Sequence, residues 1–116
     1  MIMRRVNILG VDVSAINLSE ALEQLQGWIA ARRRNYVCVA GVHGIMESWR
    51  DNRLRSIYNH AGMVAPDGMP LVWLSWCRGF NTVARVYGPE LMLAVCERSA
   101  ATGWRHFFYG GGAWNR

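Results

Sequence analysis

The sequence predicts an α/β protein with a parallel sheet, and two observations carry that prediction. Short apolar runs rich in β-forming residues, 35–41 and 62–68, each end at a glycine. Segments with helical spacing of apolar residues lie between and around these runs, an alternation typical of strands connected by helices. The chain has 116 residues, 52% of them hydrophobic, which is enough for one domain with a core.

The amino-terminal third predicts extended structure followed by a helix. Residues 5–14 alternate around Gly10, which favours a strand pair or one bent strand. Residues 17–34 place leucines at helical spacing, with Asn17 or Ser19 as the N-cap. The arginines that close this segment suit the negative end of a helix dipole. We therefore expect an amphipathic helix that ends in arginines.

The middle of the chain predicts two buried strands joined by two short helices. Residues 35–41 and 62–68 are continuous apolar runs, as expected of parallel strands covered on both faces. Residues 42–51 and 52–61 supply the helices between them. Because ligands of such sheets bind beyond the carboxyl ends of the strands, we expect the chemistry at that edge.

The last third predicts two helices and a third strand. Residues 69–80 have helical composition, and residues 88–103 read as a helix with Pro89 in its first turn and Gly103 as its stop. Residues 104–112 predict a strand that runs into a glycine loop. The three strand ends are therefore the places where functional residues are expected.

Arginine supplies all thirteen basic residues, and the formal net charge is +5. Without lysine, neither a P-loop nor a Schiff-base enzyme is possible. An anion must be bound by arginine, backbone N–H groups or a helix N-terminus. The charge favours nucleic acid, nucleotide phosphates or an anionic membrane face, and the plainer alternative is a solvated arginine surface. Since the arginines are scattered and no aromatic–basic motif accompanies them, we expect no nucleic-acid partner.

The cysteines and the hydropathy indicate a reduced compartment. Cys38, Cys77 and Cys96 are widely spaced among apolar residues, which predicts reduced core thiols and no metal site. No stretch approaches ~20 uncharged apolar residues, so we predict no transmembrane helix. The amino terminus is a poor signal peptide. These features together favour a cytoplasmic location.

Asp67 is the first candidate for chemistry, because it stands between Pro66 and Gly68 at the end of an apolar run. A carboxylate at a strand end can act as a general base or bind a sugar hydroxyl. The alternative is a turn residue or the N-cap of the helix that follows. The residues alone leave both interpretations open.

Other candidates lie near the same predicted edge. Arg85 precedes a Gly-Pro-Glu helix start, and it is either a clamp for phosphate or carboxylate or a structural arginine. His43 follows the first apolar run, and it is either a base or phosphate ligand or a structural residue. The glycines at 110–112 could bring backbone close to a phosphate. The dinucleotide fingerprint is not satisfied, because Asn115 replaces its last glycine.

Taken in order, segments between residues 7 and 112 resemble the amino-terminal part of the WecG/TagA/CpsF bacterial glycosyltransferases. The most specific are PDGMPLVW (66–73) and RVYGPELM (85–92). The resemblance implies inverting, metal-independent enzymes with a Rossmann-like parallel sheet flanked by helices. Such enzymes transfer N-acetylmannosamine, its uronic acid or a related sugar from a UDP-sugar to a polyprenyl-diphosphate-linked sugar. The products enter teichoic acid, enterobacterial common antigen, capsule or exopolysaccharide.

The resemblance also implies roles for individual residues. Asp67 would deprotonate the acceptor hydroxyl for in-line attack on the anomeric carbon. An apolar-walled pocket would desolvate this carboxylate and make it a stronger base. Arg85 would contact the diphosphate. The substrate-binding candidates are Arg85, His43, Gly41, Gly68, Gly110, Gly111 and Gly112.

The sequence departs from the family pattern in two ways. The family commonly has Thr and Asn at the first strand end, where this chain has Val39 and Gly41, while His43 matches. Family members are much longer. We therefore expect residues 1–116 to be a single amino-terminal part of the domain, truncated before its second half, with an exposed sheet edge.

The resemblance implies no cofactor and no metal, since the UDP-sugar is a substrate. It implies a cytoplasmic protein, peripheral at the inner face of the bacterial membrane, where the lipid-linked acceptor lies. The sequence leaves open whether the chain forms a homo-oligomer. The alternatives to a transferase are an inactive fragment and a non-catalytic nucleotide-binding module.

Overall fold

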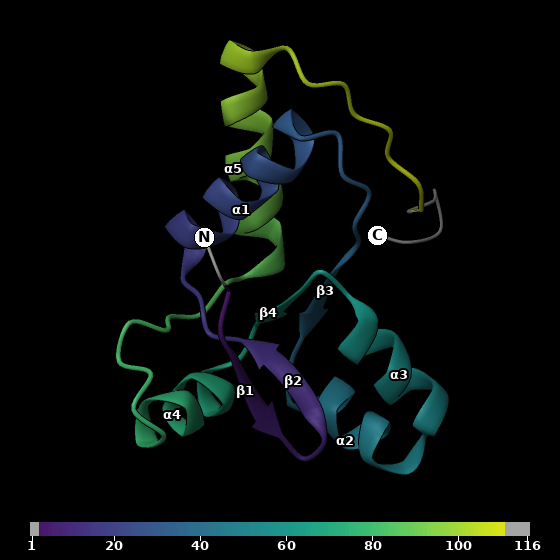
Figure 1. Ribbon diagram of the computed structural model, residues 1–116, viewed down its shortest axis with the longest axis vertical. Coiled ribbons are helices and arrows are strands. Elements are labelled where there is room, and N and C mark those ends of the chain that lie inside the picture. Colours follow the sequence, from purple (N-terminus) through teal and green to yellow (C-terminus); the bar gives the residue numbers. More distant parts are fainter. Residues whose placement is uncertain (1–2, 111–116) are drawn as a thin grey trace.

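The computed structural model describes residues 3–110 and confirms the α/β class, with a small parallel sheet flanked by helices (Figure 1). Most of the expected elements are present, in the expected order. Their bounds are β1 (Arg5–Ile8), β2 (Val11–Ser14), α1 (Leu18–Ala30), β3 (Val37–Ala40), α2 (Val42–Arg50), α3 (Asn52–His60), β4 (Met63–Pro66), α4 (Met69–Cys77) and α5 (Gly88–Thr102).

Two small sheets organise the described part of the chain. β1 and β2 form an antiparallel hairpin, so residues 5–14 are a strand pair and not one bent strand. Its turn places Gly10 at a φ of 91°, in the left-handed region that glycine enters without strain. β3 and β4 pair in parallel, from Val37 opposite Met63 to Ala40 opposite Pro66. This pair confirms both predicted parallel strands. Burial on both faces is confirmed for β4 but wrong for β3, where Ala40 is buried and Val39 is 40% exposed.

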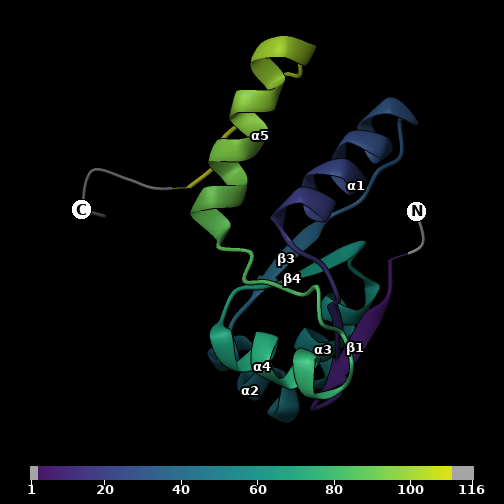
Figure 2. The same cartoon turned by 90° about the vertical axis from the view of Figure 1, so that its left-hand side faces the viewer.

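β4 is the central strand of the core, because every one of its residues is buried. Figure 2 shows α1 and α5 side by side at one end of the molecule, with α2, α3 and α4 at the other. One apolar cluster joins the β1–β2 hairpin and β4 to α2 and α4. It includes Ile8, Val11, Ile45, Val64 and Leu71. The second cluster joins β4 to α1 and α5 through Ala21, Met63, Ala65, Val86 and Leu91.

Ser14 ties the hairpin to β4. Its Oγ accepts a hydrogen bond from the Val64 N–H at 2.9 Å, and the side chain is fully buried. We expect Ser14→Ala to lower the free energy of unfolding by about 1–3 kcal/mol, because the Val64 N–H is left buried without a partner. Urea unfolding measures this loss. The matched control is Ser19→Ala on the exposed face of α1, and an equal loss in both variants would contradict the role of Ser14.

Asn17 is the N-cap of α1, as one of the two predicted alternatives. Its side chain accepts from the Glu20 N–H at 3.0 Å, and the Glu20 carboxylate accepts from the Asn17 N–H at 3.1 Å. This reciprocal pair is a capping box. The helix ends at Ala30, so the prediction that arginines lie in its last turn is wrong. Arg32 has a φ of 54°, a left-handed conformation that cannot continue an α-helix.

The predicted strand at residues 104–112 is wrong for the part that the structure describes. Residues 103–110 are neither helix nor strand, and residues 111 and 112 lie outside the described range. Phe107 and Tyr109 are 89% and 97% exposed, so no layer covers these β-forming side chains. A strand needs a neighbour that takes up its N–H and C=O groups, and within residues 3–110 β3 has only β4.

The three cysteines are free, but only two fit the prediction of core thiols. Cys38 and Cys96 are half-buried, and burial raises the pKa of the Cys38 thiol above its ordinary value. Cys77 is exposed on α4, so the prediction that it is a core thiol is wrong. Both faces of α4 are apolar in sequence, so periodicity could not assign Cys77 to one of them. No helix within residues 3–110 is long and apolar enough to cross a membrane.

Candidate active site

Asp67 lies at the carboxyl edge of the parallel sheet. It follows β4 directly, and its N–H donates to the Ala40 carbonyl at 2.8 Å, which extends the β3–β4 ladder by one residue. The Asp67 side chain is 20% exposed. The backbone is therefore fixed by the sheet, while the carboxylate reaches solvent at the edge where ligands of such folds bind.

The Asp67 carboxylate is held by a cation and by the start of a helix. The Arg85 Nε lies 3.1 Å from Asp67 Oδ1, and the Gly88 N–H donates to Oδ2 at 3.5 Å. Both contacts place a positive charge or a positively polarised N–H group against the carboxylate, and so they fix its orientation. We expected apolar walls around the Asp67 carboxylate. That expectation is wrong for the wall that Arg85 forms, because this wall is a charged guanidinium.

The interpretation of Asp67 as an N-cap for the next helix is wrong. The N-cap of α4 is Gly68, and no side chain donates or accepts a capping hydrogen bond there. The carboxylate turns instead to the first residue of α5, twenty-one positions further along the chain.

Arg85 is positioned by the loop between α4 and α5. The Val86 N–H donates to the Pro66 carbonyl at 2.8 Å, which fixes this loop against the end of β4. The Arg85 guanidinium also lies 4.7 Å from the centroid of the Tyr87 ring. Its side chain is 47% exposed, so N–H groups of the guanidinium that do not meet Asp67 face solvent. An anionic ligand can therefore reach Arg85 without displacing the loop.

Three helices begin around Asp67, and in none of them does the side chain of the N-cap residue make a capping hydrogen bond. The N-caps of α2, α4 and α5 are Gly41, Gly68 and Tyr87. A Cβ on Gly68 would lie 3.9 Å from the Gly41 Cα, and a Cβ on Gly41 would lie 3.4 Å from the Asp67 carbonyl oxygen. At α2 and α4, the glycine N-caps leave the first-turn N–H groups open to a ligand, and such groups favour anions.

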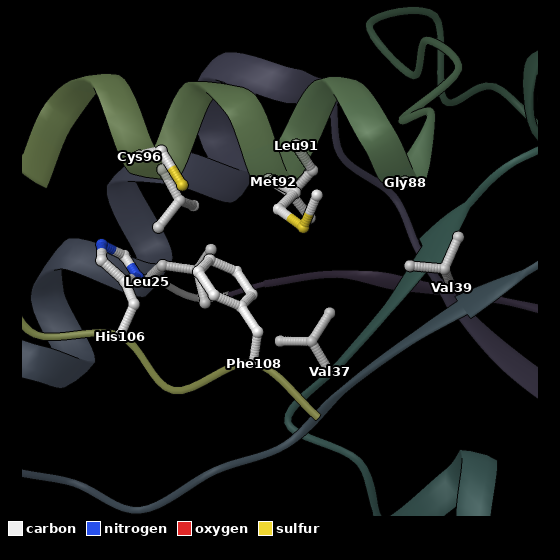
Figure 3. A pocket seen from close by; sticks show the side chains of 10 residues that line it. Leu25, Val37, Val39, Gly88, Leu91, Met92, Cys96, His106 and Phe108 are labelled. Atoms are coloured by element: carbon white, nitrogen blue, oxygen red, sulfur yellow. The ribbon is translucent and has the colours of Figure 1, made fainter. Parts of the chain in front are cut away.

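An open apolar pocket of about 300 Å³ adjoins the carboxylate (Figure 3). Gly88 and Val39 connect the two, because a Cβ on Gly88 would lie 3.6 Å from Val39 Cγ1 and 3.9 Å from Asp67 Oδ2. Figure 3 shows the remaining walls, which come from α1, β3, α5 and the segment after α5. They are Leu25, Val37, Leu91, Met92, Val95, Cys96, His106 and Phe108.

The structure brings some of the predicted site residues together and leaves others apart. Asp67, Arg85, Gly41 and Gly68 share one edge of the sheet, as described above. His43 lies in the first turn of α2 with its side chain 90% exposed, and its Nε2 is 3.9 Å from Glu47 of the same helix. No described contact connects the His43 side chain to Asp67.

The predicted glycine loop contributes little to this site in the described part of the chain. Gly110 has a φ of 109°, and no heavy atom lies within 4 Å of its Cβ position. Gly111 and Gly112 lie outside the described residues. The proposed phosphate contacts of these three glycines stay predictions.

Sequence reasoning missed the roles of Gly88 and Tyr87. The Gly-Pro-Glu sequence at 88–90 did indicate a helix start, and hence a place that attracts an acid. That the acid is Asp67 depends on the loop between α4 and α5, whose path no local pattern encodes.

Fold and geometry define an α/β protein with a candidate ligand site at the carboxyl edge of its parallel strands, built from an acid–arginine pair and the glycine-capped N-termini of α2 and α4. A comparison with protein families matches residues 6–115 to the Glycosyl transferase WecG/TagA/CpsF family. The match covers nearly the whole chain, so the protein belongs to this glycosyltransferase family. No curated protein matches the chain. Membership implies a sugar donor and an acceptor as substrates.

Proposed function

We propose that the chain carries the acceptor-activating site of an inverting glycosyltransferase, with Asp67 as the general base. The carboxylate accepts the proton of an acceptor hydroxyl, the freed oxygen attacks the anomeric carbon, and the bond from that carbon to the UDP oxygen breaks. UDP leaves with the bonding electron pair. The observation that carries the proposal is the position of Asp67 at the sheet edge, where Arg85 and the first N–H of α5 orient its carboxylate.

Arg85 and the helix N-termini supply positive charge for the leaving diphosphate. Arg85 keeps solvent-facing N–H groups beside Asp67, and α2 and α4 direct first-turn N–H groups to the same edge. These groups support transfer without a metal, because they can neutralise charge that develops on UDP.

The substrates follow from the family and the sequence motifs. We propose a UDP-N-acetylmannosamine-type donor, or its uronic acid, and a polyprenyl-diphosphate-linked sugar as acceptor. The reaction belongs to the synthesis of teichoic acid, exopolysaccharide or a related surface polymer, at the cytoplasmic face of the membrane. The +5 net charge supports work beside diphosphates and anionic lipids.

The test is transfer from UDP-N-acetylmannosamine to a short-chain lipid-diphosphate N-acetylglucosamine, with the purified chain. Release of UDP together with an elongated acceptor supports the proposal. A folded chain that releases no UDP contradicts it.

A second candidate, a non-catalytic module that binds a sugar nucleotide, is favoured by Val39 and Gly41. Both lie beside Asp67, where the family commonly has Thr and Asn, so the site lacks two polar side chains. UDP binding by calorimetry without turnover would support this candidate over the transferase.

Restoring the two polar side chains separates the candidates. We expect Val39→Thr with Gly41→Asn to raise turnover by about tenfold if the site is catalytic, since two hydrogen bonds that together stabilise the transition state by about 1.4 kcal/mol correspond to that factor. Gly41 has a φ of −103°, which other residues adopt, and room for a Cβ. Initial rates measure the gain, and Val42→Thr on exposed α2 is the matched control. Unchanged turnover would contradict a catalytic deficit at these positions.

A further inference from the structure

One face of α4 leaves apolar side chains open to solvent beside the candidate active site. Met69, Trp73 and Leu74 are 37%, 54% and 42% exposed. The opposite face of this helix packs Leu71, Val72 and Ser75 into the core. The helix is thus anchored from behind, and the exposed side chains need no rearrangement to meet a partner.

Between the two acids Asp67 and Glu90, the charged side chains of α4 and of the loop that follows it all have one sign. From Gly68 to Pro89 the sequence contains no acidic residue, and its only charged side chains are Arg78 and Arg85. A further cation, Arg4, lies 5.0 Å from the ring centroid of Phe80, just after the helix. An apolar face rimmed by arginines complements anionic lipid headgroups above an acyl layer.

The aromatic residues of α4 fit an interface between water and lipid. Trp76 is 43% exposed, and its indole N–H already donates to the Val83 carbonyl at 2.7 Å. Tryptophan is enriched at membrane interfaces, where part of the ring meets acyl chains and part meets headgroups. Trp73 and Trp76 therefore add affinity for a lipid surface, and docking leaves the indole N–H of Trp76 paired.

We propose that the exposed face of α4 docks on an anionic lipid surface, with Met69, Trp73 and Leu74 at the boundary of headgroups and acyl chains. Arg4 and Arg78 then meet lipid phosphates. The inference rests on the proposed function in one respect, because a lipid-linked acceptor must reach Asp67. Asp67 precedes α4 by two residues, so docking of this helix brings the site to the level of the membrane surface.

The test is cosedimentation of the purified chain with vesicles of phosphatidylglycerol and phosphatidylcholine, against vesicles of phosphatidylcholine alone. We expect Trp73→Ser with Leu74→Ser to weaken partitioning onto the anionic vesicles by at least about tenfold, the factor that corresponds to removing one large apolar side chain. The matched control is Leu93→Ser on α5, which is 61% exposed and has Glu90 and Glu97, not arginines, at helical spacing on either side. This control should retain binding within about twofold.

Charge gives an independent variant, should the apolar pair disturb folding. Arg4→Gln with Arg78→Gln should remove the preference for anionic vesicles, because each arginine near the surface adds attraction to the negative headgroups. Equal binding to both vesicle types by the parent chain would overturn the proposal. So would equal loss in the α4 and Leu93 variants. A dimer that the α4 variant turns into monomer, with vesicle binding unchanged, would make this face an interface between copies of the chain.

Vesicle binding needs no sugar nucleotide, so its failure is distinct from failure of the proposed function. If the chain transfers sugar to a water-soluble acceptor, but the α4 variant binds vesicles as well as the parent chain does, the proposed docking surface is overturned and the proposed function is not. The reverse result, α4-dependent binding without transfer, would leave the surface standing and remove the proposed function.

Discussion

Asp67→Asn is expected to lower kcat for sugar transfer by about 10²–10⁴-fold, the range that a positioned general base contributes. The amide keeps the shape of the side chain, but it cannot take the proton of the acceptor hydroxyl. Initial rates of UDP release measure kcat, and binding of UDP by calorimetry shows whether the donor site survives. We expect UDP affinity to stay within about threefold, since the carboxylate itself does not attract the diphosphate.

The fold should survive this change. The pair of Asp67 and Arg85 is partly exposed, so its loss costs no more than about 1 kcal/mol of the free energy of unfolding. Glu90→Gln is the matched control, because it neutralises another carboxylate in the first turn of α5. Parental turnover by Asp67→Asn would contradict its role as base. If Glu90→Gln lowers kcat by the same factor, the effect comes from loss of negative charge at the start of α5 and not from loss of a general base.

Local patterns were sufficient to predict most elements of this fold. Asn17 and Glu20 have the spacing of a capping box, and Pro89 and Gly103 mark both ends of α5. Each of these signals depends on residues only a few positions apart, so it does not depend on how the rest of the chain folds. The parallel pairing of β3 and β4 also followed from the sequence, because a continuous apolar run flanked by helices is typical of a doubly covered strand.

The errors fall where structure depends on distant partners. Residues 104–109 are strong β-formers, yet within the described residues no strand receives their hydrogen bonds. α4 is apolar on every face, so its sequence could not show that Leu71 is buried while Trp73 is exposed. Propensity describes the segment alone, whereas burial depends on which elements pack against it.

The candidate site shows the same division between local and distant signals. Asp67 and Arg85 were found separately, each at the edge of a recognisable motif. Their contact across eighteen positions depends on the hydrogen bond from Val86 to the Pro66 carbonyl, which no local pattern predicts. Sequence motifs therefore indicated the residues of the site, whereas the contact between Asp67 and Arg85 depends on the fold.

Arg85→Ala is expected to lower kcat/KM for the UDP-sugar by about 10²–10³-fold, the effect of removing one preorganised donor for developing charge. The loss should appear both in kcat and in UDP affinity, because the guanidinium contacts Asp67 through Nε and keeps other N–H groups open toward an anion. Arg85→Lys should recover only part of it, since an ammonium group cannot form the same fork of donors. Arg53→Ala on exposed α3 is the matched loss of charge.

The two roles of Arg85 can be separated in the background of Asp67→Asn. If Arg85 acts only by orienting the carboxylate, its removal has no further effect once that carboxylate is gone. If it also binds the diphosphate, UDP affinity falls in both backgrounds by the same factor, while the kcat effects of two contacting residues fall short of their product. Calorimetry with UDP on the four variants of this cycle decides between these outcomes. If Arg85→Ala leaves UDP affinity unchanged, Arg85 does not bind the diphosphate, and its role is to position Asp67.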